Sequence, residues 1–154
     1  MSASTDGGLA AYEARLAAYD ARVAAAWATN KAALFDALEA AGIAVVVVTF
    51  DGSGDAGQIE ELTPFDADNN PVELPGGTVS ATQVSFDTQE VTTAQETPRA
   101  VIEDLAYGAL EQRHPGWEDG DGAFGEFTFA VADRTVVLGF NARYTTSDFS
   151  EHSV

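Results

Sequence analysis

The sequence predicts an α+β fold with a mostly antiparallel sheet, built from a meander and a C-terminal hairpin. Three observations predict it: an alanine-rich N-terminal stretch with helical periodicity, a series of short β-branched segments bounded by turn residues, and a second helical stretch near residues 98–114. Helices segregated from a run of neighbouring strands are typical of this class. We expect residues 1–8 to form a disordered tail and residues 9–154 a single globular domain.

A seven-residue repeat predicts the N-terminal helix. The segments AAYEARL, AAYDARV and AAAWATN follow one another, and alanine, a strong helix former, fills many positions. The large side chains recur at spacings of three and four, which places them on one stripe of a helix. This stripe would pack on the domain's own sheet or pair with a second copy, so we expect a monomer or a dimer through this helix. Its members are Leu9, Tyr12, Leu16, Tyr19, Val23 and Trp27.

The segment after this repeat predicts a further helix and then a strand. Asn30 is a favourable helix N-cap, so a second helical stretch is predicted from Lys31 to Ala41, ending at Gly42. The run IAVVVVTF, residues 43–50, follows directly. A continuous β-branched run of this kind predicts a central strand or a strand covered on both faces.

The rest of the chain predicts more strands and one helix. Thr97 and Pro98 are typical of a helix start, and Pro115 and Gly116 end the apolar periodicity that follows them. The last quarter predicts a hairpin, because apolar residues alternate on both sides of the turn ADRT. The remaining predicted strands are residues 58–65, 71–74, 78–91, 124–131 and 136–144.

Charge is the most unusual property of the chain. It has seven basic and 25 acidic residues, a net charge of −18, and residues 51–154 hold 20 of the acids. Such a field repels nucleic acid and anionic membranes and attracts basic proteins or cations. The chain has no cysteine and shows neither a long apolar run nor a secretory signal pattern. We therefore expect a cytoplasmic protein that contacts no membrane and no nucleic acid directly, and whose partner is a basic host protein.

Two loops combine acids and glycines just before a strand. DGSGDAGQIEEL and EDGDGAFGEFTF share the order acid, glycine, acid, glycine, then a glutamate at a strand start. Glycine lets backbone amides point into a shared concavity, so we expect both loops at the same end of the sheet, framing one pocket with Trp117 and Phe124 as walls. The candidate binding residues are Asp51, Asp55, Glu60, Glu61, Trp117, Glu118, Asp119, Asp121, Glu126 and Arg143.

Other interpretations of the loops remain open. They can be simple tight connections, since glycine and aspartate are common turn residues. Glycine amides with Arg143 or His114 can hold a small anionic or polar ligand, although the many nearby carboxylates oppose an anion. Clustered carboxylates can hold Ca²⁺ or Mg²⁺, although the EF-hand pattern is absent. For this metal site the candidate ligands are Asp51, Asp55, Asp119 and Asp121. No common catalytic motif is present, so enzymatic activity is not favoured, and no other cofactor is expected.

Three motifs together carry a resemblance to a known family. DGSGDAGQIEEL, HPGWEDGDGAFGEFTF and NARYTTSDFSEH, in this order, resemble an uncharacterised bacterial family of small acidic proteins found on plasmids, other mobile elements and phages. The resemblance covers about residues 30–154. It implies an accessory role in mobile elements and brings no activity with it. Ala56 stands where the family pattern often has serine, which argues against a hydroxyl-dependent role at this position.

These observations lead to a functional hypothesis and one alternative. We expect a non-enzymatic acidic binding protein that docks on a basic nucleic-acid-binding protein by nucleic-acid mimicry, as an anti-defence inhibitor does. Carboxylates at alternate strand positions lie ~6.6–6.8 Å apart and helical i,i+4 pairs ~5–6 Å apart, spacings at which phosphate-binding arginines can be satisfied. The alternative is a divalent-cation- or small-ligand-binding domain that uses the two loops and has hydrolytic activity.

Overall fold

The structure, a computed structural model, describes residues 3–53, 56–119, 121–144 and 153. It confirms the α+β class with an N-terminal helix and antiparallel strand pairing. The chain divides into two compact units, Met1–Ile43 with Leu74–Gly108 and Ala44–Glu73 with Ala109–Val154. The predicted division into a tail and one globular domain stays a prediction. The elements are α1 (Ala3–Ala40), β1 (Ile43–Ser53), β2 (Ala56–Asp66), β3 (Val79–Val84), β4 (Val91–Glu96), α2 (Pro98–Arg113), β5 (Ala123–Ala130) and β6 (Thr135–Ala142).

The first unit contains α1, which is one helix and not two. Asn30 was predicted to cap a second helix, but the helix continues through it because no glycine or proline lies between Leu9 and Ala41. Instead, the Asn30 side chain holds the backbone of β3. Its Nδ2 donates to the Thr82 carbonyl at 3.0 Å, and its Oδ1 accepts from the Thr82 amide at 2.7 Å. The side chain that resembled a cap therefore ties α1 to β3.

Strands β3 and β4 form a two-stranded antiparallel sheet in the first unit. They pair from Val79 with Glu96 to Val84 with Val91. The prediction of one strand over residues 78–91 was wrong, because the chain turns between the two strands. This turn is closed by hydrogen bonds from the Ser85 amide to the Glu90 carbonyl and from the Gln89 amide to the Ser85 carbonyl, both 2.9 Å.

Helix α2 begins where the sequence predicted it. The Thr97 hydroxyl accepts a hydrogen bond from the Ala100 amide at 3.2 Å, which satisfies one of the free amides of the first turn. Val101, Ile102 and Leu105 lie on its buried face. No helix in the described part of the chain is both long and apolar enough to cross a membrane.

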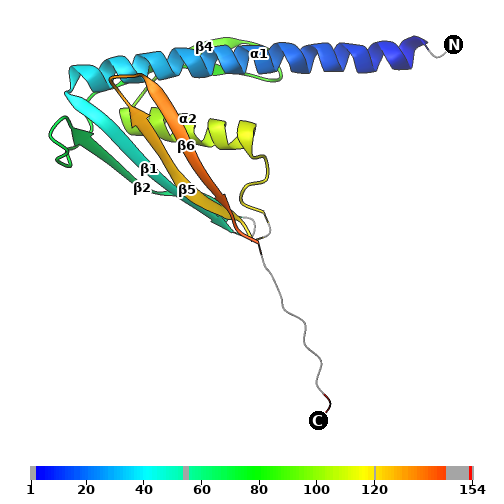
Figure 1. Ribbon diagram of the computed structural model, residues 1–154. Coiled ribbons are helices and arrows are strands. Elements are labelled where there is room, and N and C mark those ends of the chain that lie inside the picture. The colour runs from blue at the N-terminus through cyan, green and yellow to red at the C-terminus, as the bar shows by residue number, and fades with distance from the viewer. Residues whose placement is uncertain (1–2, 54–55, 120, 145–152, 154) are drawn as a thin grey trace. The chain divides into compact units, whose positions relative to one another are not determined.

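The second unit is built on a four-stranded sheet in the order β2-β1-β5-β6 (Figure 1). The β-branched strand β1 is central, as predicted, and the predicted hairpin is formed by β5 and β6. Val46 lies opposite Phe129 and Val48 opposite Phe127. These four side chains and Phe50 are buried, so one face of this sheet carries the core of the unit. The prediction of a strand over residues 71–74 was wrong, because only Pro71 forms an isolated bridge, to Phe65.

Candidate functional site

The two acidic glycine-rich segments lie at the same end of the four-stranded sheet, but the first was wrongly predicted to be a loop over residues 51–57, because β1 extends to Ser53 and β2 begins at Ala56. Strands β1 and β5 run antiparallel, and Gly52 near the end of β1 lies opposite Ala123 at the start of β5. The end of β1 and the start of β5 therefore lie at one sheet end, which confirms the predicted placement of the two segments. Asp55 lies outside the described residues.

Trp117, predicted as a pocket wall, packs into the second unit. Only 6% of its surface is exposed, and its ring meets Phe50 edge-on with a centroid distance of 5.6 Å. A Cβ atom at Gly52 would lie 2.6 Å from Trp117 Cζ3, and a Cβ atom at Gly57 would overlap Trp117 Cη2. Two glycines of the first loop are therefore required by the indole, a role that the sequence analysis missed. The only signal was a tryptophan within the matching second loop.

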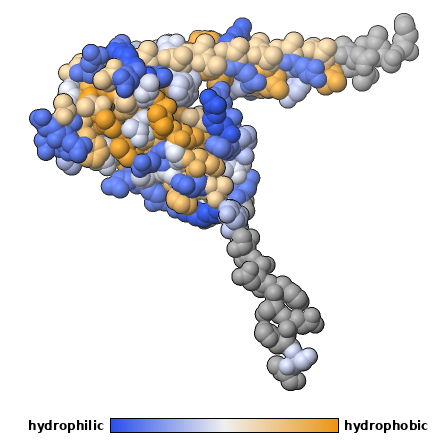
Figure 2. Space-filling model, viewed as in Figure 1, coloured by the Kyte–Doolittle hydropathy of each residue, from blue (hydrophilic) through white to orange (hydrophobic). Residues whose placement is uncertain are grey.

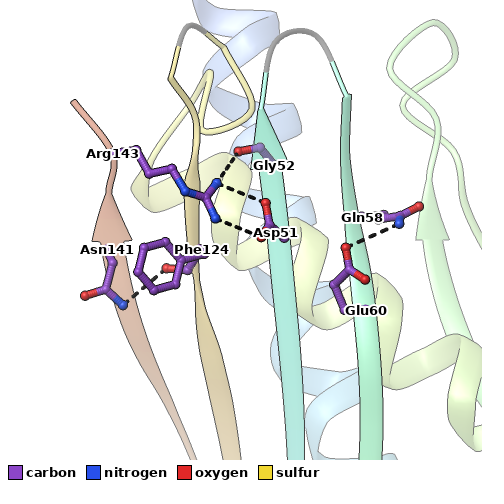
Figure 3. Close-up of polar contacts among 7 residues, drawn as sticks. All are labelled: Asp51, Gly52, Gln58, Glu60, Phe124, Asn141 and Arg143. Carbon is purple, nitrogen blue, oxygen red and sulfur yellow. Dashed lines mark hydrogen bonds and ion pairs between the residues drawn. The ribbon is translucent and has the colours of Figure 1, made fainter. Parts of the chain in front are cut away.

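Asp51 and Arg143, both predicted binding residues, form a bidentate ion pair (Figure 3). Arg143 Nη1 donates to Asp51 Oδ1 at 3.0 Å and Nη2 to Oδ2 at 2.8 Å. Nη1 also donates to the Gly52 carbonyl at 3.2 Å. The guanidinium carbon lies 4.7 Å from the centroid of the Phe124 ring, within cation–π range. The two charges neutralise each other, so this pair adds no net charge to the surface. The net negative charge there comes from the other acidic residues.

The hydrogen bonds from Arg143 hold the pKa of Asp51 below its ordinary value; desolvation opposes them in part, and the charge of Arg143 adds a smaller lowering effect. Replacing Arg143 with Gln should therefore raise the pKa of Asp51. The ion pair stabilises the fold at neutral pH, and this contribution is lost as pH falls through the lowered pKa of Asp51. The stability difference between the wild type and Asp51→Asn should thus shrink on acidification.

Carboxyl NMR titration and thermal unfolding from about pH 7 to about pH 3 measure both effects. Glu126→Gln is the matched control. It removes a carboxylate from β5, the strand next to the one that carries Asp51, and Arg143 bonds Asp51 and not Glu126. An Asp51 pKa that does not move in Arg143→Gln would contradict the assignment.

The sheet face opposite Trp117 presents three predicted binding residues from three strands. Gly52 and Gly57 both turn toward Trp117, so alternation places Asp51 and Glu60 on the opposite face. Glu126 pairs with Thr49 and shares this face. Phe124 and Val137 lie on it with 43% and 60% of their surface exposed. We call this the outer sheet face. Figure 2 shows apolar surface over the four-stranded sheet with hydrophilic side chains around it.

The remaining predicted acids lie near this sheet end without forming a recognisable metal site. Glu61 is exposed and follows Glu60 on β2, so it points to the other face. Asp119 lies in a turn in which its amide bonds the Gly116 carbonyl and its carbonyl accepts from Gly122. One carboxylate oxygen of Glu118 is buried with no hydrogen-bond partner among the described residues. Asp121 is exposed. Within residues 3–53, 56–119, 121–144 and 153, no three His, Cys, Asp or Glu residues gather as a metal site.

His114, the other residue considered for a polar ligand, is held by packing. Its ring stacks on Phe140 with a centroid distance of 3.6 Å and an interplanar angle of 5°. Its backbone amide bonds the Leu110 carbonyl at 2.8 Å, which extends the last turn of α2. The imidazole is therefore engaged in ring stacking.

Comparison with known proteins gives a family and no described activity. No curated protein and no solved structure matches the chain. The family model that matches covers residues 26–154, which includes both loops, the whole four-stranded sheet and α2. The chain therefore belongs to the family of unknown function DUF6878.

Proposed function

We propose that this protein is a non-enzymatic binding protein whose outer sheet face docks on the basic surface of a nucleic-acid-binding protein. The observation that supports this most is the location of its charge. No charged side chain among the described residues is buried, so the acids lie at the surface. The second unit holds 15 acidic and three basic residues, a net charge of −12.

The distribution of basic residues adds to this argument. No lysine or arginine occurs between Lys31 and Arg99, a stretch that contains β1, β2, β3 and β4. Of the three basic residues in the second unit, Arg143 is neutralised by Asp51. A cationic partner would therefore meet little repulsion at the outer sheet face, and nucleic acid would be repelled.

The outer sheet face also has the composition of a docking surface. Exposed Phe124 and Val137 supply apolar contact area, while Glu60 and Glu126 supply charge beside them. Protein interfaces combine an apolar centre with a polar rim in this way. Adjacent strands lie ~4.8 Å apart, and β1 separates the strands of Glu60 and Glu126, so the two carboxylates can each meet a different cationic side chain of the partner. Inhibition of a defence protein, by occupying its nucleic-acid site, is the narrower form of this proposal.

Charge-reversal variants test the docking surface. The double variant Glu60→Lys/Glu126→Lys should lose most capture of basic proteins enriched on heparin from a bacterial lysate. The control Glu13→Lys/Asp20→Lys changes the total charge equally, but on exposed positions of α1 in the first unit. It should retain most of the capture, because a surface that binds locally depends on nearby charges more than on the total.

Two further measurements, competition by DNA and dependence on salt, show whether the outer sheet face binds at the nucleic-acid site of the captured protein. Added duplex DNA should displace it, and sodium chloride should weaken capture while raising the melting temperature of the free protein, since screening relieves repulsion within the chain. Equal loss in both double variants would contradict docking on the outer sheet face. Capture that DNA leaves unchanged would contradict nucleic-acid mimicry.

A further inference from the structure

The first unit contains a pocket that none of the preceding arguments uses. It has a volume of about 540 Å³ and lies between α1, β3 and the first part of α2. This volume is within the range of small-molecule sites, ~300–1,000 Å³. Much of its wall is apolar and aromatic, with Trp27, Tyr19, Val84 and Leu105 among its members.

Fixed contacts hold the walls of this pocket in place. Trp27 Nε1 donates to the Leu105 carbonyl at 3.1 Å, which joins α1 to α2. Gly108 on α2 lies against the indole of Trp27. A Cβ atom at this position would lie 3.4 Å from Trp27 Cδ1. The paired hydrogen bonds between Asn30 and Thr82 join α1 to β3. The walls are thus tied together in the absence of a ligand, which lowers the ordering cost of binding.

Two carboxyl groups supply the charged part of the lining, beside the polar side chains of Asn30, Thr82 and Gln83. Glu96 at the end of β4 and Asp104 on α2 both line the pocket, close enough for the charge of Glu96 to act on Asp104. Gln83 Nε2 donates to Glu96 Oε1 at 3.1 Å and fixes this carboxyl further. Asp104 is exposed, but partial desolvation, followed by the negative charge of Glu96, raises the pKa of Asp104. Two acids held against each other in an acidic protein are a favourable place for a cation.

The aromatic wall favours the same kind of ligand. Tyr19 and Trp27 line the pocket, and the faces of such aromatic rings attract cations. A guanidinium suits the site better than an ammonium, because its planar fork binds carboxylates in pairs and stacks on aromatic rings. It is also more weakly hydrated, which reduces the cost of entering a half-enclosed apolar pocket.

We infer that this pocket binds a guanidinium-bearing ligand, whose cationic group lies against Glu96 and Asp104 and whose aliphatic part packs on the apolar wall. The residues involved belong to the first unit and are separate from the outer sheet face. The sequence offered no signal for the acid pair, since its members are eight positions apart across a strand–helix junction.

Calorimetric titration of the full chain tests the pocket. The probe is agmatine, and (4-aminobutyl)urea, which keeps the ammonium but replaces the guanidinium with a neutral urea, is the control. Agmatine should bind, and the urea should bind at least tenfold more weakly or not at all. Glu96→Gln and Asp104→Asn should each weaken agmatine binding about tenfold or more, because each removes a charge-assisted hydrogen bond. Glu103→Gln is the matched control, since Glu103 adjoins Asp104 on α2 but pairs with Arg99 at 3.2 Å, and it should keep the wild-type affinity.

The two tryptophans locate the bound ligand. In NMR spectra, agmatine should shift the indole N–H signal of Trp27, assigned with Trp27→Phe, and leave the signal of Trp117 in place. A short peptide, acetyl-Gly-Arg-Gly-amide, then distinguishes the source of the guanidinium. Tighter binding of the peptide indicates an arginine side chain of a protein, and tighter binding of agmatine indicates a free small molecule.

Three outcomes would overturn the inference. These are no binding of either probe, equal weakening by Glu103→Gln and Asp104→Asn, and a shift of the Trp117 signal alone. Circular dichroism of each variant establishes that it is folded before titration.

Discussion

Replacing Gly125 with alanine should destabilise the second unit by about 3 kcal/mol or more, near or above the usual upper cost of overpacking. Gly125 lies on β5 between Phe50 of β1 and Phe140 of β6. An added Cβ atom would overlap the carbonyl oxygen of Gly139 and lie 3.0 Å from Phe50 Cζ. Because the Gly139 oxygen belongs to the backbone of β6, it cannot move aside without disturbing the pairing of β5 with β6.

Gly139→Ala is the matched control for this prediction. Gly139 lies on β6, the strand paired with β5. A Cβ atom at this position would lie 3.7 Å from the Glu126 carbonyl oxygen, which is an ordinary contact. Alanine also restricts the unfolded chain, so this variant should be neutral or slightly more stable. Urea unfolding followed by circular dichroism measures both variants. Similar stabilities for the two proteins would show that the strands can separate at Gly125 at little cost.

Replacing Trp117 with alanine should cost about 3–5 kcal/mol, the usual range for removing a large buried aromatic side chain. Only 6% of the Trp117 surface is exposed. Its ring contacts Phe50 and lies against the backbone at Gly52 and Gly57. Its loss would leave a cavity between the β1–β2 end of the sheet and the loop before β5. Urea unfolding measures this loss, and Trp117→Leu, which fills part of the cavity, should recover part of the stability.

A double-mutant cycle shows whether the glycines of the first loop serve this tryptophan. In the wild-type background, Gly57→Ala should cost about 1–3 kcal/mol, because its Cβ atom would overlap Trp117 Cη2. In the Trp117→Ala background, the same change should cost almost nothing, because the overlapping ring is gone. Additive costs in the two backgrounds would mean that Gly57 is required for another reason.

Local patterns in the sequence were sufficient to predict most elements of this protein. The capping threonine before Pro98, the β-branched run of β1 and the alternation in β5 and β6 each act over a few neighbouring residues. Such features depend on backbone preferences and side-chain periodicity, which can be recognised within short segments of the sequence. The matched acid–glycine order of two segments also led to the prediction that they lie at one sheet end, but the antiparallel pairing of β1 with β5 that places them there joins distant parts of the chain.

Contacts between distant segments determined what the individual residues do. Asn30 has the character of a helix cap, yet it bonds Thr82 on β3, 52 residues away. Asp51 and Arg143 are 92 residues apart and were both candidate ligand residues, yet they bind each other. The glycines of the first loop permit the close approach of Trp117, and Glu96 meets Asp104 only because β4 and α2 line one pocket. A side chain's chemistry is visible in the sequence, but its partner is set by packing, because the free energy of each contact depends on which groups the fold brings within a few ångströms.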